Sequence, residues 1–197
     1  MLLEIRQAVR ALAAQPSLVI VSVLTLAIGI GGNTAMFTVV DAVLLRPLPF
    51  HDPGRLMSLS ERHPALPTLS VSWQNYRDWR DSSTSFAAVG AYRPVNFTLT
   101  GGSEPERVPG KMVTANMLAM LGVQPSLGRD FREDEDQAGG APVVLISEGL
   151  WQRRFGGARD VAGTTLVVDN TPRTIAGVLP AGFQLVQPAD VLVPIGP

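Results

Sequence analysis

The sequence contains no cysteine and only two histidines. The absence of cysteine excludes disulfide bonds, thiolate metal sites and a cysteine nucleophile, and it leaves the redox compartment open. His51 and His63 stand in proline-rich stretches with no further ligand residues at the spacing of a metal site. We therefore expect neither a metal site nor a cofactor.

An excess of positive charge is also missing. The chain has 16 Lys and Arg residues against 17 Asp and Glu residues, for a net charge of -1. A nucleic-acid partner is therefore not expected, because such proteins carry a clearly basic surface. Charge is absent locally as well, since no charged residue occurs between Arg10 and Asp41. The other charges are spread over the rest of the chain.

A glycine-containing apolar stretch occupies part of this uncharged region and continues beyond it, with the sequence LTLAIGIGGNTAMFTVVDAVLLRPLPF. A dinucleotide-binding loop requires G-x-G-x-x-G between a strand and a helix. Gly29 and Gly31 fit this pattern, but the third position is Thr34. No lysine follows the glycines, as a phosphate-binding Walker loop would require. A nucleotide site is therefore not predicted.

The same stretch has the length and composition of a membrane span. Residues 17–36 are free of charge, and about 20 apolar helical residues cross a bilayer core of about 30 Å. The helix could run from Ser17 to Leu45 before Pro47 ends it. Arg6 and Arg10 lie upstream, so the N-terminus is predicted to be cytoplasmic. We expect a transmembrane helix with an outer stalk over residues 16–45.

A cleaved signal peptide is the competing interpretation of this segment. The small residues in AIGIGGNTA could form a cleavage site after an apolar region. Apolar helical character resumes afterwards, however, with Met36, Phe37, Val39 and further residues up to Leu45. This continuation favours an uncleaved span.

The flanking segments complete the predicted topology. Leu2, Ile5, Val9 and Leu12 recur at helical spacing, so residues 1–15 are expected to form an amphipathic helix along the cytoplasmic face. Residues 46–197 are then extracytoplasmic. The predicted location is a cell membrane.

Small residues give the span a candidate packing face. Ala27, Gly31 and Ala35 recur every four residues and so lie on one side of the helix, where they would let another membrane helix approach closely. Asn33 lies elsewhere on the circumference, and its amide should face a partner helix or the outer interface. A simpler alternative is that the glycines only loosen the helix. The packing interpretation requires other membrane helices as partners.

The exterior region reads as an α+β domain, a mixture of sheet and helix. Ser72 can cap a helix that carries Trp73, Tyr76 and Trp79 at i, i+3 and i+6, a stripe more typical of core packing than of a ligand platform. Strands are expected at residues 56–60, 86–92 and 95–99. In the last of these, alternation predicts that Val95, Phe97 and Leu99 point inward.

The second half of this region repeats a strand–helix pattern. The segments KMVTANMLAMLGV and APVVLISEGLWQRRFGG each read as a strand followed by a short helix and a glycine. A hairpin with its turn at residues 169–172 and a last strand at 191–194 follow. We expect an open-faced sheet with helices on one side.

No enzymatic site is predicted. Ser147 follows a strand and opens a helix, but Leu145 stands where a hydrolase elbow needs glycine, and an N-cap role fits better. The acidic segment GRDFREDEDQAGG does not match a calcium loop and reads as a solvated loop, with weak cation binding as the alternative. Its carboxylates are Asp130, Glu133, Asp134, Glu135 and Asp136.

Taken together, these segments resemble a known family. The apolar stretch resembles the first span of MacB/FtsX-type ABC transporter permeases, in particular the acidobacterial-type duplicated group. The similarity continues through SWQNYRDWRDSSTSFAAVGAYRPVNFTLTGGSEPERVPGKMVTANMLAMLGVQPSLGRDF, PVVLISEGLWQRRFGG and TIAGVLPAGFQL. It covers nearly the entire chain. Each piece is weak alone, but the joint pattern is specific.

The resemblance implies a MacB-like periplasmic core domain inserted after the first membrane helix, in a bacterial inner (cell) membrane. It also implies a cytoplasmic ABC ATPase that moves this domain to export or extract substrates, and further permease helices or a second permease subunit as partners in the lipid bilayer. Family members continue beyond the position of Pro197 to three more spans, so the resemblance implies a fragment. The alternative hypothesis is a single-span, membrane-anchored extracytoplasmic binding or scaffold protein.

Overall fold

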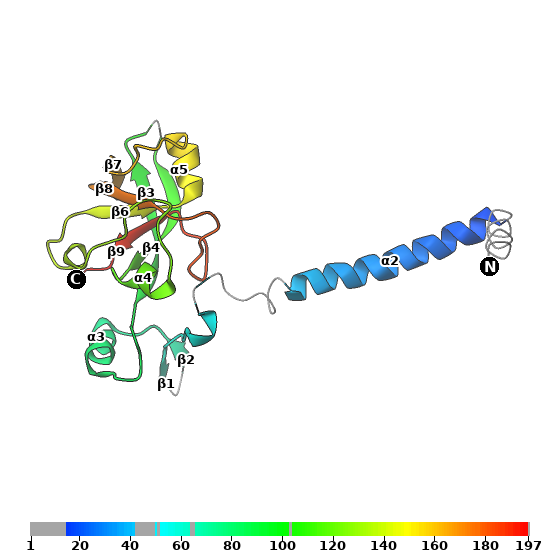
Figure 1. The fold of residues 1–197 in the computed structure, drawn as a ribbon, viewed down its shortest axis with the longest axis horizontal. Coiled ribbons are helices and arrows are strands. Elements are labelled where there is room, and N and C mark those ends of the chain that lie inside the picture. Colours follow the sequence, from blue (N-terminus) through cyan, green and yellow to red (C-terminus); the bar gives the residue numbers. More distant parts are fainter. Residues whose placement is uncertain (1–14, 42–49, 51, 64–65, 103, 197) are drawn as a thin grey trace. The chain divides into compact units, whose positions relative to one another are not determined.

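A computed structural model describes residues 15–41, 50, 52–63, 66–102 and 104–196 (Figure 1). The chain divides into two compact units, Met1–Leu48 and Pro49–Pro197. The amphipathic helix predicted for residues 1–15 lies outside the described residues except for Gln15, and so does the end of the predicted span beyond Asp41.

The first unit contains one long helix, α2 (Pro16–Val40). A proline at its start suits a helix N-terminus, where a backbone N–H would have no helical partner. The helix has no charged residue, none of its residues is buried, and it is about 38 Å long at 1.5 Å per residue. Within the described part of the chain, it is the one helix whose length and composition suit a membrane span, with a mean hydropathy of 1.9.

The second unit is built on a mixed sheet of seven strands, in the order β5-β8-β6-β9-β4-β3-β7. The pairs β4–β9 and β6–β8 are parallel, and the other pairs are antiparallel. The strands are β3 (Tyr92–Thr100), β4 (Glu106–Val113), β5 (Leu127–Gly128), β6 (Val143–Ile146), β7 (Thr165–Val168), β8 (Thr171–Val178) and β9 (Val191–Pro194).

The sheet closes on itself, which corrects the expectation of an open-faced sheet. Strand β7 pairs with β3 through Leu99 and Val168, and it also pairs with β8 along the hairpin. Six strands therefore form a continuous ring of pairings, with β5 added to β8 at Leu127 and Val178. Closure of this kind removes most of the free strand edge that an open sheet would expose.

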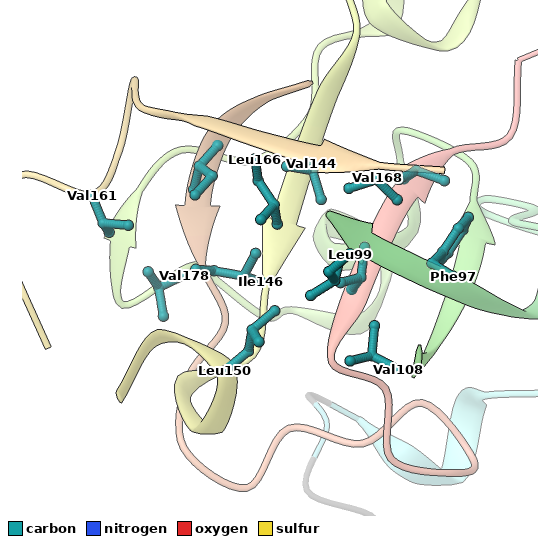
Figure 2. Packing of buried hydrophobic residues seen from close by; sticks show 13 residues of the cluster. Phe97, Leu99, Val108, Val144, Ile146, Leu150, Val161, Leu166, Val168 and Val178 are labelled. Atoms are coloured by element: carbon teal, nitrogen blue, oxygen red, sulfur yellow. The ribbon is translucent and has the colours of Figure 1, made fainter. Parts of the chain in front are cut away.

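Two apolar clusters lie on opposite faces of this sheet because successive side chains of a strand point to opposite sides. In β6, for example, Val144 and Ile146 belong to one cluster, and Val143 and Leu145 belong to the other. The first cluster fills the ring of strands (Figure 2) and contains Phe97, Leu99, Val108, Val144, Ile146, Leu150, Val161, Leu166, Val168, Ile175, Val178, Val191 and Val193.

The helices pack on both faces, and not on one face as expected. Helix α5 (Glu148–Phe155) adds Leu150 to the first cluster, whereas α4 (Met117–Leu121) adds Leu118 to the second. Both helices end in the predicted glycines, which have the left-handed φ values of 68° at Gly122 and 60° at Gly156. Glycine adopts this conformation without a Cβ penalty.

A smaller substructure precedes the main sheet and is grouped at one end of it (Figure 1). It contains a short 3-10 turn, η2 (Pro53–Arg55), the antiparallel pair β1 (Glu61–His63) and β2 (Leu66–Leu69), and helix α3 (Trp73–Ser82). The cap predicted for α3 is confirmed, because Ser72 Oγ accepts a hydrogen bond from the N–H of Asn75. The Glu61 carboxylate also binds this end of the helix, through the N–H of Ser72 at 2.9 Å and Asn75 Nδ2 at 2.7 Å.

Three local expectations were wrong. Residues 56–60 and 86–91 have neither helix nor strand conformation, and the expected strand at 86–92 begins only at Tyr92. Apolar residues there favoured strands, but neither segment finds a partner strand. The hairpin turn is also shorter than expected. It consists of Asp169 and Asn170, both with positive φ, and Thr171 already belongs to β8.

The other predicted elements are confirmed. In β3 the side chains of Phe97 and Leu99 are buried and Val95 is half-buried, so the predicted alternation holds. The strand–helix pairs β4–α4 and β6–α5 and the last strand β9 lie where the sequence placed them. An additional 3-10 turn, η3 (Glu133–Asp136), was not expected.

Candidate functional site

The predicted packing face lies on a helix that is open around its whole circumference. Ala27, Gly31 and Ala35 are all exposed in α2. A Cβ placed on Gly29, Gly31 or Gly32 would meet no atom within 4 Å. The small residues therefore leave room for a second helix, and their contact with one stays a prediction.

The polar groups of α2 differ in how they are satisfied. The hydroxyls of Thr25 and Thr38 each donate to a backbone carbonyl one turn earlier, at 2.8 Å. Among the described residues, the Asn33 amide has no hydrogen-bond partner. It lies about 200° around the helix from Gly31, at about 100° per residue, and so on nearly the opposite side. A helix packed against the small-residue face would therefore not reach the Asn33 amide, which would need another partner.

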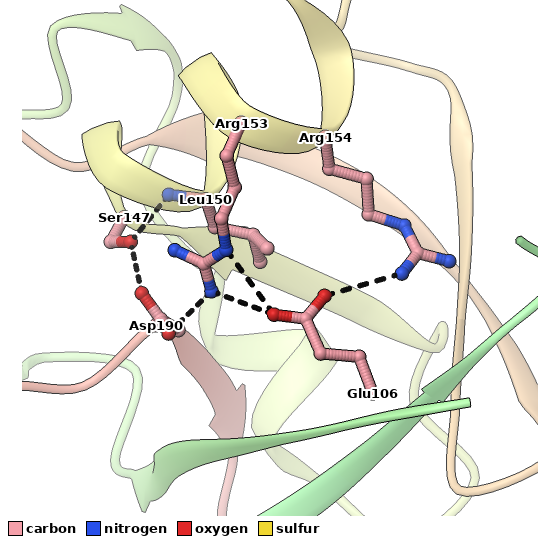
Figure 3. Close-up of polar contacts among 6 residues, drawn as sticks. All are labelled: Glu106, Ser147, Leu150, Arg153, Arg154 and Asp190. Atoms are coloured by element: carbon pink, nitrogen blue, oxygen red, sulfur yellow. Dashed lines mark hydrogen bonds and ion pairs between the residues drawn. The ribbon is translucent and has the colours of Figure 1, made fainter. Parts of the chain in front are cut away.

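A network of polar side chains joins α5 to two strands of the sheet (Figure 3). Ser147 Oγ accepts from the N–H of Leu150 at 3.0 Å and donates to Asp190 Oδ1 at 2.7 Å. Arg153 binds the other oxygen of Asp190 at 2.8 Å and reaches Glu106 at 3.1 Å. Arg154 lies 3.6 Å from the second oxygen of Glu106. The hydrogen bond to Asp190 is the main cause that raises the pKa of Arg153.

This network confirms the N-cap role of Ser147. Its hydroxyl both caps α5 and donates to a carboxylate, and these two bonds fix the start of the helix on β9. No sequence signal pointed to Asp190, which lies 43 residues away. The arrangement ties the helix to the sheet and holds no reacting group in place.

The acidic segment is ordered by specific contacts, so the expectation of a solvated loop was wrong for two of its residues. Glu135 is buried and accepts from both terminal nitrogens of Arg129, at 2.9 and 2.5 Å. Burial favours a higher pKa for Glu135, but these bonds and the N–H of Arg132 outweigh it and hold the pKa below its usual value. Asp136 accepts from the backbone N–H of Ala115 and Gly196, both at 2.9 Å.

The only lysine in the chain, Lys111, is buried in β4 and 2 % exposed. Its ammonium donates to the carbonyl oxygen of Gln187 in the loop before β9. Burial lowers the pKa of this lysine. The same loop contains a tight turn in which the N–H of Gln187 binds the carbonyl of Leu185 at 2.8 Å, with Val186 at a φ of 66°. A β-branched residue is strained in this conformation, so Lys111 helps to hold a strained turn.

An apolar groove of about 1410 Å³ lies within the second unit, beside α3. Tyr76 of α3 is buried in its wall, lies 5.1 Å from the ring of Trp73, and donates from its hydroxyl to the carbonyl of Val89 at 3.4 Å. Burial raises the pKa of Tyr76. The aromatic stripe was predicted to be core packing. Tyr76 meets this expectation, but Trp73 and Trp79 are half-buried and line the groove.

No group of three or more His, Asp or Glu residues converges in the described part of the chain. In the acidic segment at η3, the Glu135 carboxylate accepts from Arg129, and the Asp136 carboxylate accepts from two backbone N–H groups.

Comparisons with known proteins agree with this architecture. The family model of the MacB-like periplasmic core domain matches residues 19–196. The curated proteins contain no significant match. A similar solved structure is the extracellular domain of the noncanonic ABC-type transporter YknZ from Gram-positive bacteria, with a TM-score of 0.50 and 17% identity over 59% of each chain. At this identity the likeness concerns the fold alone.

A second similar structure is the periplasmic region of MacB from Actinobacillus actinomycetemcomitans. The TM-score is 0.48 and the identity 17%, over 58% of this chain and 50% of that chain. The chain thus spans 59% and 50% of the two solved domains. The family match extends over most of the sequence and confirms the resemblance noted from the residues. The chain belongs to the family of MacB-like periplasmic core domains.

Proposed function

We propose that this chain is part of the permease of an ABC-type export or mechanotransmission system, with an exterior domain that is moved by a partner ATPase. The observation that carries this proposal is the combination of an apolar helix without buried residues and, after it in the sequence, a domain of the MacB-like family. Such a helix exposes its apolar side chains and suits a lipid bilayer, where its small residues let neighbouring helices pack closely. The partners would be membrane lipid, further permease helices or a second permease subunit, and a cytoplasmic ABC ATPase.

The second unit has the properties of a body that transmits force. Its strands pair in a ring, and α5 is fixed to β4 and β9 by Arg153 through Glu106 and Asp190. The bidentate contact between Arg129 and Glu135 secures another loop. A displacement applied at one end of such a domain moves the whole domain, because packed interiors deform little. This mechanical role needs no reacting group, and it fits the expectation that the chain is not an enzyme.

A single-span binding or scaffold protein is the second candidate, and the groove beside α3 favours it. A groove lined largely by apolar and aromatic side chains is a usual feature of a binding site. The two candidates differ in one requirement. A permease part must contact other membrane helices, whereas an anchored binding protein has no such need.

Cysteine cross-linking separates these candidates, since the chain has no cysteine of its own. Single cysteines at Ala27, Gly31 and Ala35 would be introduced and oxidised in native membranes together with the co-expressed neighbouring genes. We expect cross-links to a second membrane protein from these positions and none from Leu26. Equal cross-linking at all positions, or none at all, would favour the single-span protein.

Topology is tested separately, with alkaline phosphatase fused after Pro197 and with mass spectrometry of the mature N-terminus. We expect active phosphatase and an intact N-terminus. Activity from a cytoplasmic reporter alone would contradict the orientation, and a chain that begins near residue 36 would show a cleaved signal peptide.

A further inference from the structure

Exposed apolar side chains of the second unit are concentrated at the groove beside α3. Five large hydrophobic residues are exposed among its described residues: Met57, Leu59, Phe86, Tyr92 and Val186. The first four line the groove, and Met57 is 75% exposed. Soluble surfaces rarely gather such residues without an interaction to cover them. The groove is therefore a candidate docking surface.

Two of the segments that line the groove also have free backbone groups. Residues 57–59 and 85–88 have neither helix nor strand conformation, and within the described structure their N–H and C=O groups make no hydrogen bond. In the second segment, Ala87 and Ala88 are exposed and small, so another backbone can approach closely. An extended peptide can pair its own backbone with such free groups while its side chains contact the apolar lining, which is the combination that strand addition uses at a sheet edge.

The other residues that line the groove can contact ligand side chains of different shapes. Trp73 and Trp79 of α3 present large aromatic surfaces, and Met112 and Met120 add flexible thioether side chains. Methionine adapts to irregular partners, and aromatic side chains supply much of the contact energy at interfaces. Such a lining binds apolar side chains without demanding one sequence.

The charge of the lining is slightly positive. Its charged residues are Asp52, Arg55 and Arg93. Asp52 precedes η2, and its carbonyl accepts from the N–H of Arg55 at 2.9 Å. Arg93 is exposed in β3 and forms no ion pair with any residue that the structure describes. Its guanidinium contacts the sulfur of Met112. A carboxylate on a ligand would match Arg93.

We propose that this groove binds an extended, apolar segment of another polypeptide that carries a carboxylate. A lipid acyl chain fits the apolar lining but would cover the backbone groups of residues 57–59 and 85–88 without replacing their hydrogen bonds to water. Burying such groups unpaired costs free energy, whereas a peptide backbone pairs with them. This partner class goes beyond the proposed function and does not depend on it, because binding needs no ATPase.

The test uses the full chain in nanodiscs and a fluorescein-labelled peptide of sequence VLTVEVL. Binding is measured by fluorescence anisotropy, and again by the emission of Trp73 and Trp79 in a Trp151→Phe background, because Trp151 does not line the groove. We expect saturable binding. Phe86→Ser should weaken it about tenfold. Arg93→Gln should weaken it about two- to fivefold, and should leave a peptide with Gln in place of Glu unaffected.

Val186→Ser is the control, since it removes an apolar side chain outside the groove that is more exposed than Phe86, at 74% against 36%. It should leave binding unchanged. A peptide N-methylated at alternate residues keeps its side chains but loses backbone donors, and it should bind about tenfold more weakly. Circular dichroism confirms that each variant is folded.

Three results would overturn the proposal. The first is the absence of saturable peptide binding up to about 1 mM. The second is an equal loss in Val186→Ser and Phe86→Ser. The third is undiminished binding of the N-methylated peptide together with its displacement by phosphatidylglycerol vesicles, which would make lipid the occupant.

Discussion

Ser147 and Asp190 are 43 residues apart in the chain, yet the serine hydroxyl donates to the aspartate carboxylate over 2.7 Å. The same hydroxyl caps α5 at the N–H of Leu150. The start of the helix is therefore held by the helix itself and by the residue that precedes β9. This double role distinguishes Ser147 from Ser72, whose hydroxyl caps α3 at 3.2 Å and has no described carboxylate partner.

The two caps should differ in their contribution to stability. Ser147→Ala removes a cap and leaves Asp190 with one donor fewer, so we expect the free energy of unfolding to fall by about 2 kcal/mol. Ser72→Ala removes a cap alone and should cost about 1 kcal/mol or less. Urea unfolding followed by tryptophan fluorescence measures both. Equal losses would show that the bond to Asp190 contributes nothing.

Gly110 of β4 should not tolerate a methyl group. A Cβ at this position would lie 2.4 Å from Cδ2 of Phe97 and 2.7 Å from the carbonyl oxygen of Val191. Overpacking of this kind costs about 1–3 kcal/mol, so Gly110→Ala should lower the melting temperature. Gly54→Ala is the control, because no atom lies within 4 Å of its Cβ. If Phe97 causes the clash, Phe97→Leu should partly rescue Gly110→Ala.

Lys111 should make stability depend on alkaline pH. Burial lowers the pKa of Lys111 in the folded state below the ordinary value of 10.5, so the unfolded chain binds more protons in the window between the two values. Stability therefore rises as pH increases through this window. The Tyr76 pKa is raised above 10.0, and its opposite effect begins near that value. The measurement thus belongs below about pH 10.

Lys111→Met is the matched variant for this pH dependence. It keeps an unbranched side chain but removes the titrating group and its hydrogen bond to Gln187. We expect the increase in urea midpoint with pH, measured below about pH 10, to disappear in this variant. A rise of the same size in both proteins would assign the effect to another group.

The small-residue face of α2 predicts a specific loss of helix association. Gly31→Leu places a branched side chain where two backbones would approach, and insertion should survive because leucine is favourable in the bilayer. The variant should reach the membrane but should not co-purify with permease helices supplied on a second chain. Leu26→Phe is the control, since it lies about 140° around the helix from Gly31. Equal retention of the partner by both variants would mean that the glycines only loosen the helix.

The sequence by itself determined the features that depend on near neighbours. The caps at Ser72 and Ser147 and the glycine ends at Gly122 and Gly156 act within one helical turn. The length of the apolar run predicted α2, and the alternation in β3 predicted which side chains are buried. These signals could be read directly, because the periodicity of a helix or strand is fixed by backbone geometry.

Tertiary structure decided everything that joins distant segments. The pairing of β7 with both β3 and β8 closed a sheet that was expected to be open-faced. Residues 56–60 and 86–91 have no partner strand. Tertiary packing also buried Lys111 against Gln187 and paired Glu135 with Arg129. Hydrophobic burial is non-directional. A pattern of apolar residues therefore predicts that one face of a helix or strand is buried, but it does not predict which segment packs against that face.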